Sequence, residues 1–131
     1  MRQSPVFAKE DTMLFVYDPQ IKNDMTVKAW LDKHEVKYTE RIVTEDPITP
    51  QDLLDWSDRG HISIKAFLQP EKFSLRAILI NNQMALMERA MRAHVIAAVP
   101  QFIPHPIMVG EDFVVMGMDN AAWRRALNIL S

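Results

Sequence analysis

The stretch Met13-Leu-Phe-Val-Tyr17, with Asp18-Pro-Gln-Ile-Lys-Asn-Asp24 and Lys28-Ala-Trp-Leu31 after it, decides the fold class. The first segment is a short apolar run that is typical of a buried strand. The second contains proline and aspartate, which favour a turn, and either Asn23 or Asp24 can cap a helix. The sequence therefore predicts a strand, a short turn and a helix in immediate succession.

A turn of this kind is a favourable place for a Cys-x-x-Cys pair, because a helix N-terminus stabilises a thiolate. Here the two corresponding positions are Ile21 and Asp24, and the 131 residues include no cysteine. Thiol–disulfide exchange at this turn is therefore excluded. We interpret Asp24 as a residue that starts the helix rather than as an acid–base catalyst.

Length and composition predict one soluble globular domain. Hydrophobic residues make up 48% of the chain and charged residues 24%, which suits a protein with a real core. A net charge of −2 means that the chain lacks the overall positive charge that is typical of nucleic-acid-binding proteins. No apolar run reaches membrane-spanning length, and residues 1–12 lack the apolar centre of a secretion signal. We expect an N-terminal extension over 1–12, one domain over 13–131 and a cytoplasmic location.

A second helix is predicted from Thr49-Pro-Gln-Asp52. Thr49 can cap it, Pro50 suits its first position, and Asp52 completes a capping box. We expect Gly60 to end it, because glycine adopts the left-handed conformation just past a helix terminus.

The segments before and after this helix predict a strand and further helices, and one of these segments is undecided between the two. Residues 36–43 predict a partly exposed strand and residues 63–68 a short helix, whereas residues 75–80 are undecided between strand and helix. A further helix is predicted from an apolar stripe at helical spacing: Met84, Met87, Met91, Val95 and Ala98.

The C-terminal part predicts a hairpin and a last helix. Residues 106–109 and 113–116 are apolar strands around a glycine turn, and Asp119 caps the helix that follows. The order is therefore β-α-β, a helical middle, then β-β-α. The first unit would be parallel and the later pair a hairpin, so both halves can share one mixed sheet. The fold class is thioredoxin-like α/β with a helical insertion.

Several short stretches, in the same order, also match a known family. They are Tyr17-Asp-Pro19, Lys28-Ala-Trp-Leu-Asp-Lys-His-Glu35, Val36-Lys-Tyr-Thr-Glu-Arg-Ile42, Glu45-Asp-Pro-Ile-Thr49, His105-Pro-Ile-Met-Val109, Val115-Met-Gly-Met-Asp119 and Trp123-Arg-Arg125. Through them residues 13–130 resemble the Spx and ArsC-type arsenate reductase family, and Spx more closely.

The departures from that family concern its chemistry. Ile21 and Asp24 stand where its cysteines would be, and His105 replaces the arginine before Pro106. An ungapped count places Leu68 at a second arginine position. In a reductase those arginines hold an oxyanion while a thiolate attacks it. We therefore expect no enzyme activity and a degenerate redox site of Ile21, Asp24, His105 and Pro106. A trans bond before Pro106 is the commoner state, and the family implies the cis alternative.

The resemblance to Spx implies a transcription regulator, active in stress responses, that binds the C-terminal domain of the RNA polymerase α subunit. A glycine at the end of the second helix belongs to that binding surface in Spx, and Gly60 stands at the matching place. The implied contact residues are Gly60, Trp56, Ser57, Asp58, Arg59 and His61, with Pro19, Gln20 and Ile21 of the first loop. Such a regulator would respond to its amount and not to a disulfide.

Other interpretations stay open beside this one. Gly60 is equally explained as an ordinary helix cap. A degenerate arsenate-reductase-like protein could act as an interaction or antagonist module, and an enzyme using the remnant cleft is a further rival. A protease or its adaptor is a second candidate partner, and promoter DNA is expected only within the polymerase complex. We expect no membrane partner and no cofactor. We also expect no metal, because the four histidines lack the spacing of metal ligands.

Overall fold

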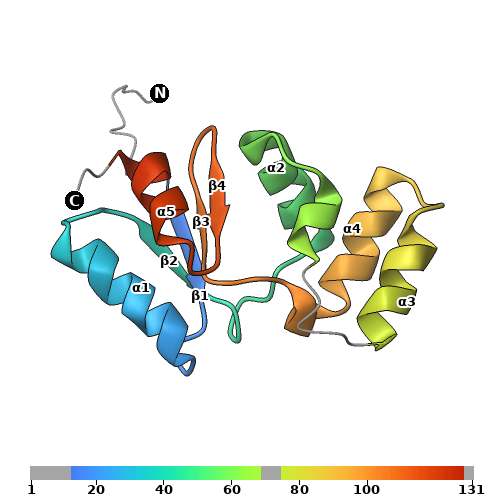
Figure 1. Ribbon diagram of the computed structural model, residues 1–131, viewed down its shortest axis with the longest axis horizontal. Coiled ribbons are helices and arrows are strands. Elements are labelled where there is room, and N and C mark those ends of the chain that lie inside the picture. Colours follow the sequence, from blue (N-terminus) through green and yellow to red (C-terminus); the bar gives the residue numbers. More distant parts are fainter. Residues whose placement is uncertain (1–12, 69–74, 129–131) are drawn as a thin grey trace. The chain divides into compact units, whose positions relative to one another are not determined.

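The structure is a computed structural model that describes residues 13–68 and 75–128 (Figure 1). The chain divides into two compact units. Unit 1 consists of Met1–Pro47 and His105–Ser131, and unit 2 of Ile48–Pro104. The extension expected over 1–12 lies outside the described residues, and the single domain over 13–131 stays a prediction.

Unit 1 contains a four-stranded mixed sheet in the order β2-β1-β3-β4 (Figure 1). Strand β1 (Leu14–Tyr17) pairs in parallel with β2 (Thr39–Ile42). It pairs on its other side, antiparallel, with β3 (Ile107–Val109), which forms a hairpin with β4 (Val114–Met116). The predicted combination of a parallel unit and a later hairpin in one sheet is confirmed.

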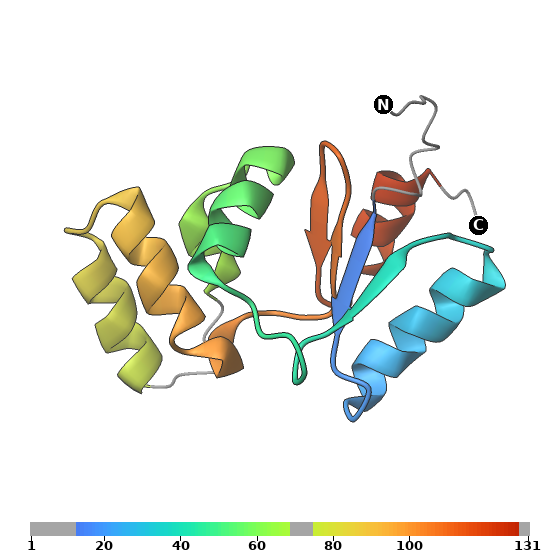
Figure 2. The same ribbon diagram turned by 180° about the vertical axis from the view of Figure 1, so that it is seen from behind.

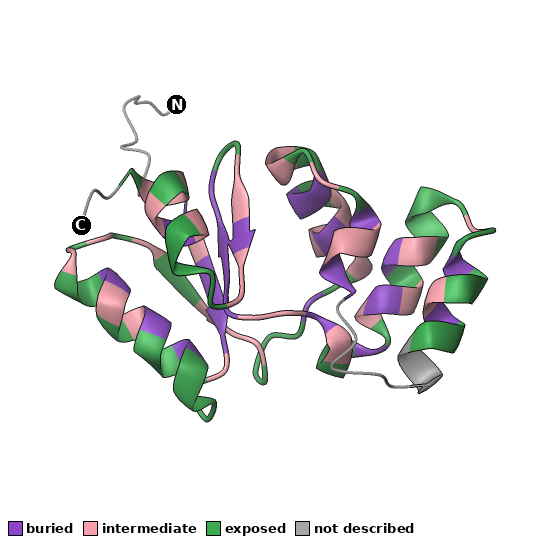
Figure 3. Cartoon of the chain, in the orientation of Figure 1, coloured by how far each residue is buried: buried purple, intermediate pink, exposed green. Residues whose placement is uncertain are grey.

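Two helices cover one face of this sheet, α1 (Lys22–Lys33) and α5 (Asn120–Leu127). Alternate strand residues point toward them, because side chains on a strand alternate between its two faces. The resulting core consists of Met13, Phe15, Tyr17, Val27, Leu31, Met108, Val115 and Trp123. Each large apolar side chain buried there contributes about 2 kcal/mol. Buried and exposed residues alternate along α1, as one-sided packing requires (Figure 3).

The first helix begins earlier than the sequence suggested. Its N-cap is Ile21, in an extended conformation, and no side chain caps it. The prediction that Asn23 or Asp24 caps α1 is therefore wrong, and Asp24 lies buried in its first turn. In α5 the predicted cap is confirmed, because the Asp119 side chain accepts a hydrogen bond from the Ala122 N–H.

The regular elements among the described residues of unit 2 are all helical (Figure 2). It contains α2 (Pro50–Gly60), the 3₁₀ turn η2 (Ile64–Phe67), α3 (Leu75–Met84), α4 (Arg89–Ala97) and the 3₁₀ turn η3 (Pro100–Phe102). Helix α4 packs against α2 and η2. The core of the unit is formed by large apolar side chains that include Leu53, Trp56, Ile64, Phe67, Met84 and Ile96.

The methionine stripe does not form one helix. Helix α3 ends at Met84 and a separate helix α4 begins at Arg89. Met84 is fully buried, whereas Met91 is 53% exposed, so the prediction of one helix with both on its buried face is wrong. The ambiguous residues 75–80 lie in α3 and are helical.

The two ends of α2 give opposite outcomes for the sequence prediction. The capping box is confirmed at the start, where Thr49 accepts from the Asp52 N–H and Asp52 accepts from the Thr49 N–H. At the other end the left-handed residue is His61, with φ of 54°, and Gly60 is the last helical residue. The prediction that Gly60 itself takes the left-handed position is therefore wrong.

Candidate functional site

The residues of the predicted degenerate redox site come together in unit 1. Ile21 directly precedes α1, Asp24 lies in its first turn, and His105 and Pro106 directly precede β3. The peptide bond between His105 and Pro106 is cis, the rarer of the two states that the sequence left open. The Asp24 Oδ2 atom lies 2.7 Å from His105 Nδ1 and accepts a hydrogen bond from the Asp18 N–H at 2.9 Å.

Burial makes this contact energetically important. The Asp24 side chain is 1% exposed and that of His105 is 27% exposed. A buried carboxylate is costly unless it is paired and hydrogen-bonded. Oδ2 receives both partners, while Oδ1 is buried and has no hydrogen-bond partner. The Asp24 carboxylate thus ties the first loop to the residue before β3.

Sequence reasoning missed this pairing. Asp24 and His105 are 81 residues apart, and no local pattern signals a contact over that separation. The resemblance assigned both residues to one degenerate site, but it gave no reason to expect a hydrogen bond between them. The missed signal is chemical, since Asp24 and His105 are an acid and a base that can pair with each other.

Titratable groups with shifted pKa values in unit 1 include the buried Tyr17 of β1 and Asp32 of α1. Burial and a hydrogen bond to Glu40 raise the pKa of Tyr17 to about 12. The Tyr38 hydroxyl donates to Asp32, and this bond together with the Lys28 ammonium lowers the pKa of that carboxyl. These hydrogen bonds lie within unit 1 and do not involve Asp24 or His105.

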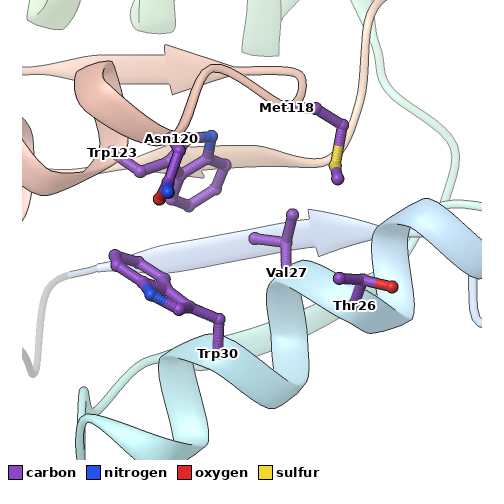
Figure 4. A pocket seen from close by; sticks show the side chains of 6 residues that line it. All are labelled: Thr26, Val27, Trp30, Met118, Asn120 and Trp123. Carbon is purple, nitrogen blue, oxygen red and sulfur yellow. The ribbon is translucent and has the colours of Figure 1, made fainter.

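Unit 1 also has a hollow of about 220 Å³ between α1 and the start of α5 (Figure 4). Figure 4 shows Trp30 and Trp123 on either side of it, with Val27 and Met118 beside them. The Trp123 ring N–H donates to the Gly117 carbonyl at 2.8 Å, so it is already satisfied. The lining carries no charged side chain and offers no clamp for an oxyanion.

The end of α2 carries most of the predicted partner contacts. Four of these residues reach the surface of unit 2, namely Asp58, Arg59, Gly60 and His61. Trp56 is 3% exposed and Ser57 5%, so their side chains belong to the interior of the unit. The participation of Trp56 and Ser57 in a contact surface stays a prediction.

Neither the formation of α2 nor its C-terminal cap requires a glycine at position 60. The left-handed position belongs to His61, and the positive-φ glycine in the described part of the chain is Gly117. Glycine within a helix costs about 0.5–1 kcal/mol relative to alanine. Capping therefore does not account for a glycine at position 60, which is half-buried at the surface of unit 2.

The first loop contributes exposed residues in unit 1. Pro19, Gln20 and Ile21 are all exposed, and Ile21 is a large apolar residue with 36% of its surface accessible. Their participation in the same contact surface as the end of α2 stays a prediction.

Residues 13–68 and 75–128 also bear on metal binding and on membrane insertion. No group of three or more histidine, aspartate or glutamate side chains there could hold a metal ion. Over the same residues, no helix combines the length and apolar character needed to cross a bilayer.

Comparison with known proteins gives matches at the level of structure. No model of a known family matches the sequence, and no curated protein does. A putative ArsC family related protein from Bacteroides fragilis is 21% identical with a TM-score of 0.71, over 87% of this chain and 96% of that one. A possible arsenate reductase from Streptococcus mutans is 20% identical with a TM-score of 0.70, over 91% and 99%.

An arsenate reductase from Vibrio cholerae gives a similar result, with 13% identity and a TM-score of 0.69 over 90% of this chain and 97% of that one. Such likeness shows the fold, and the predicted thioredoxin-like α/β class is confirmed as ArsC-like. This chain has no cysteine, so it cannot supply the thiolate of a thiol-based reductase. Fold and site together define a protein of ArsC-like fold in which the Asp24 carboxylate is buried against His105.

Proposed function

We propose that this protein is a cysteine-free, Spx-like regulator that binds the C-terminal domain of the RNA polymerase α subunit through the end of α2. The observation that carries the proposal is Gly60, a glycine that neither the helix nor its cap requires. A docking surface that needs close backbone approach favours glycine, because a large side chain at this position would separate the two proteins.

The surroundings of Gly60 suit a protein contact. Asp58 is exposed and pairs with Arg89 at 2.7 Å, and Arg59 pairs with Asp55 at 3.0 Å. Exposed pairs of this kind add little stability, so their value is in partner choice and orientation. Charged side chains next to Gly60, which has no side chain of its own, are compatible with a polar rim around a close contact.

The Asp24–His105 contact supports the second half of the proposal, the absence of a redox switch. A thiol pair at this turn would change its covalent state with oxidants, whereas a carboxylate and an imidazole do not. The regulator would therefore act according to its concentration.

Calorimetric titration of the isolated polymerase domain tests the proposal. Wild type is expected to bind with the same affinity with and without dithiothreitol. Gly60→Arg, shown to be folded by circular dichroism, is expected to lose binding, because its side chain fills the contact. Gly60→Ala is the matched control, which adds one methyl group and is expected to keep most of the affinity.

Two results would contradict the proposal. Failure of folded wild type to bind would leave the end of α2 without this partner. Equal affinity of wild type and Gly60→Arg would show that binding occurs elsewhere on the protein.

A further inference from the structure

Unit 2 contains a hollow of about 310 Å³ beside the N-terminal part of α4. Its polar lining comes from Ser57, Ser63, Arg89 and Arg92, and its apolar lining includes Ile64 and Met87. This size and mixture are typical of a small-ligand site, where an apolar wall accompanies a few placed polar groups.

Arg92 is the principal charged group of the hollow. Its Nε atom donates to the Met84 carbonyl at 2.8 Å, and Nη2 lies 3.4 Å from the Ala85 carbonyl. These contacts fix the guanidinium at the end of α3 and leave the other N–H groups without a protein acceptor in the described residues. No carboxylate among those residues pairs with it, so its positive charge is uncompensated.

Arg89 is held in a different way. Its Nη2 atom donates to Asp58 Oδ1 at 2.7 Å and to the Leu54 carbonyl at 3.1 Å. The Asp58 carboxylate compensates the charge of Arg89, so the hollow as a whole keeps the one positive charge of Arg92. A ligand with a single negative charge would balance it.

The two serines differ in what they can offer. The Ser57 hydroxyl donates to the Ile62 carbonyl and is therefore occupied. The Ser63 oxygen accepts from the Lys65 N–H at 3.1 Å, which leaves its own O–H able to donate. Ser63 at the start of η2 and Arg92 of α4 thus both supply donors to the lining of the hollow.

We propose that this hollow binds a small organic anion, whose oxyanion head is held by Arg92 and Ser63 and whose apolar body packs against Ile64 and Met87. A planar guanidinium matches carboxylate and phosphate groups through two parallel hydrogen bonds. The site does not depend on the polymerase partner, and it would exist if that proposal failed.

Amide chemical-shift titrations with three probes test the site. Butyrate and propyl phosphate carry an oxyanion on a short apolar chain, and uncharged butyramide has nearly the shape of butyrate. Butyrate is expected to bind about tenfold more tightly than butyramide, since charge-assisted hydrogen bonds are the stronger kind. The shifted amides are expected at Ser63, Arg89 and Arg92. The phosphate probe decides which head group is preferred.

An Arg92→Gln variant locates the binding, because glutamine keeps a donor for the Met84 carbonyl and removes the charge. It is expected to bind butyrate no better than butyramide, while Arg125→Ala, an exposed arginine in unit 1, is the control and should bind like wild type. Equal binding of butyrate and butyramide by wild type would overturn the proposal without any variant, and so would no binding of either anion. Undiminished butyrate binding by folded Arg92→Gln would also overturn it.

Discussion

The predicted redox site in unit 1 and the end of α2 in unit 2 differ in their exposure. In unit 1 Asp24 is buried and bonded to His105 and to the Asp18 N–H. In unit 2 the end of α2 is exposed at Asp58 and His61. The first site therefore contributes to the interior of its unit, whereas the second is accessible to a partner.

A buried polar pair stabilises the fold through its own hydrogen bonds, so removing one partner is costly. An exposed helix end makes no such demand on the interior of its unit. The largest effect on stability is therefore expected at Asp24, and smaller effects are expected at the end of α2.

The largest effect is expected from Asp24→Ala. This change removes the acceptor of two hydrogen bonds in a buried place and should lower the free energy of unfolding by about 3 kcal/mol. The matched control is Asp32→Ala on the exposed side of the same helix, which should cost under about 1 kcal/mol. Urea denaturation measures both. Equal losses in the two variants would mean that the Asp24–His105 contact does not hold unit 1 together.

A smaller gain is expected from His61→Gly. His61 occupies the left-handed position after α2, which costs an L-residue about 1–2 kcal/mol, whereas glycine takes it freely. Greater freedom of the unfolded chain offsets part of this gain, so the free energy of unfolding should rise by about 0.5–1 kcal/mol. Thermal unfolding is the measurement, and a lower midpoint for His61→Gly would contradict the assignment of the cap.

A similar or smaller gain is expected from Gly60→Ala, by about 0.5 kcal/mol, because alanine is the better helix former. The gain exists only if residue 60 is helical, as the structure has it. Urea denaturation would show a loss instead if Gly60 were the left-handed residue, so this variant and His61→Gly together decide where α2 ends.

The smallest effect concerns pH. The pKa of Asp32 is lowered by Tyr38 and Lys28, so its ionised form stabilises the fold above its ordinary value of 3.8. That contribution is lost as pH falls through the lowered pKa of the folded state. Asp32→Asn should therefore be slightly less stable than wild type at pH 7 and should match it in strong acid. A constant difference across the range, followed by urea denaturation at each pH, would contradict this origin.

Local patterns predicted much of the fold. The apolar run of β1, the capping box of Thr49 and Asp52 and the Asp119 cap are encoded within a few residues, and all three stand in the structure. The mixed sheet followed from the order of elements and from the short hairpin connection.

The failures arose where distant residues decide the outcome. Asp24 resembles a cap locally, but its partner lies 81 residues away. The methionine stripe has helical spacing throughout, yet the chain breaks after Met84, where Arg92 supplies hydrogen bonds to the freed carbonyls. The end of α2 was misplaced by one residue, because glycine at 60 made the simpler cap.

Mapping of amide chemical shifts on adding the polymerase α C-terminal domain tests the central claim most directly. The account predicts that the largest shifts fall on Asp58, Arg59, Gly60 and His61, and that the Asp24 and His105 amides move least. Shifts concentrated at Asp24 and His105 would contradict it, since the partner would then bind at the buried site of unit 1. No shifts anywhere would also contradict it, since the polymerase domain would then be the wrong partner.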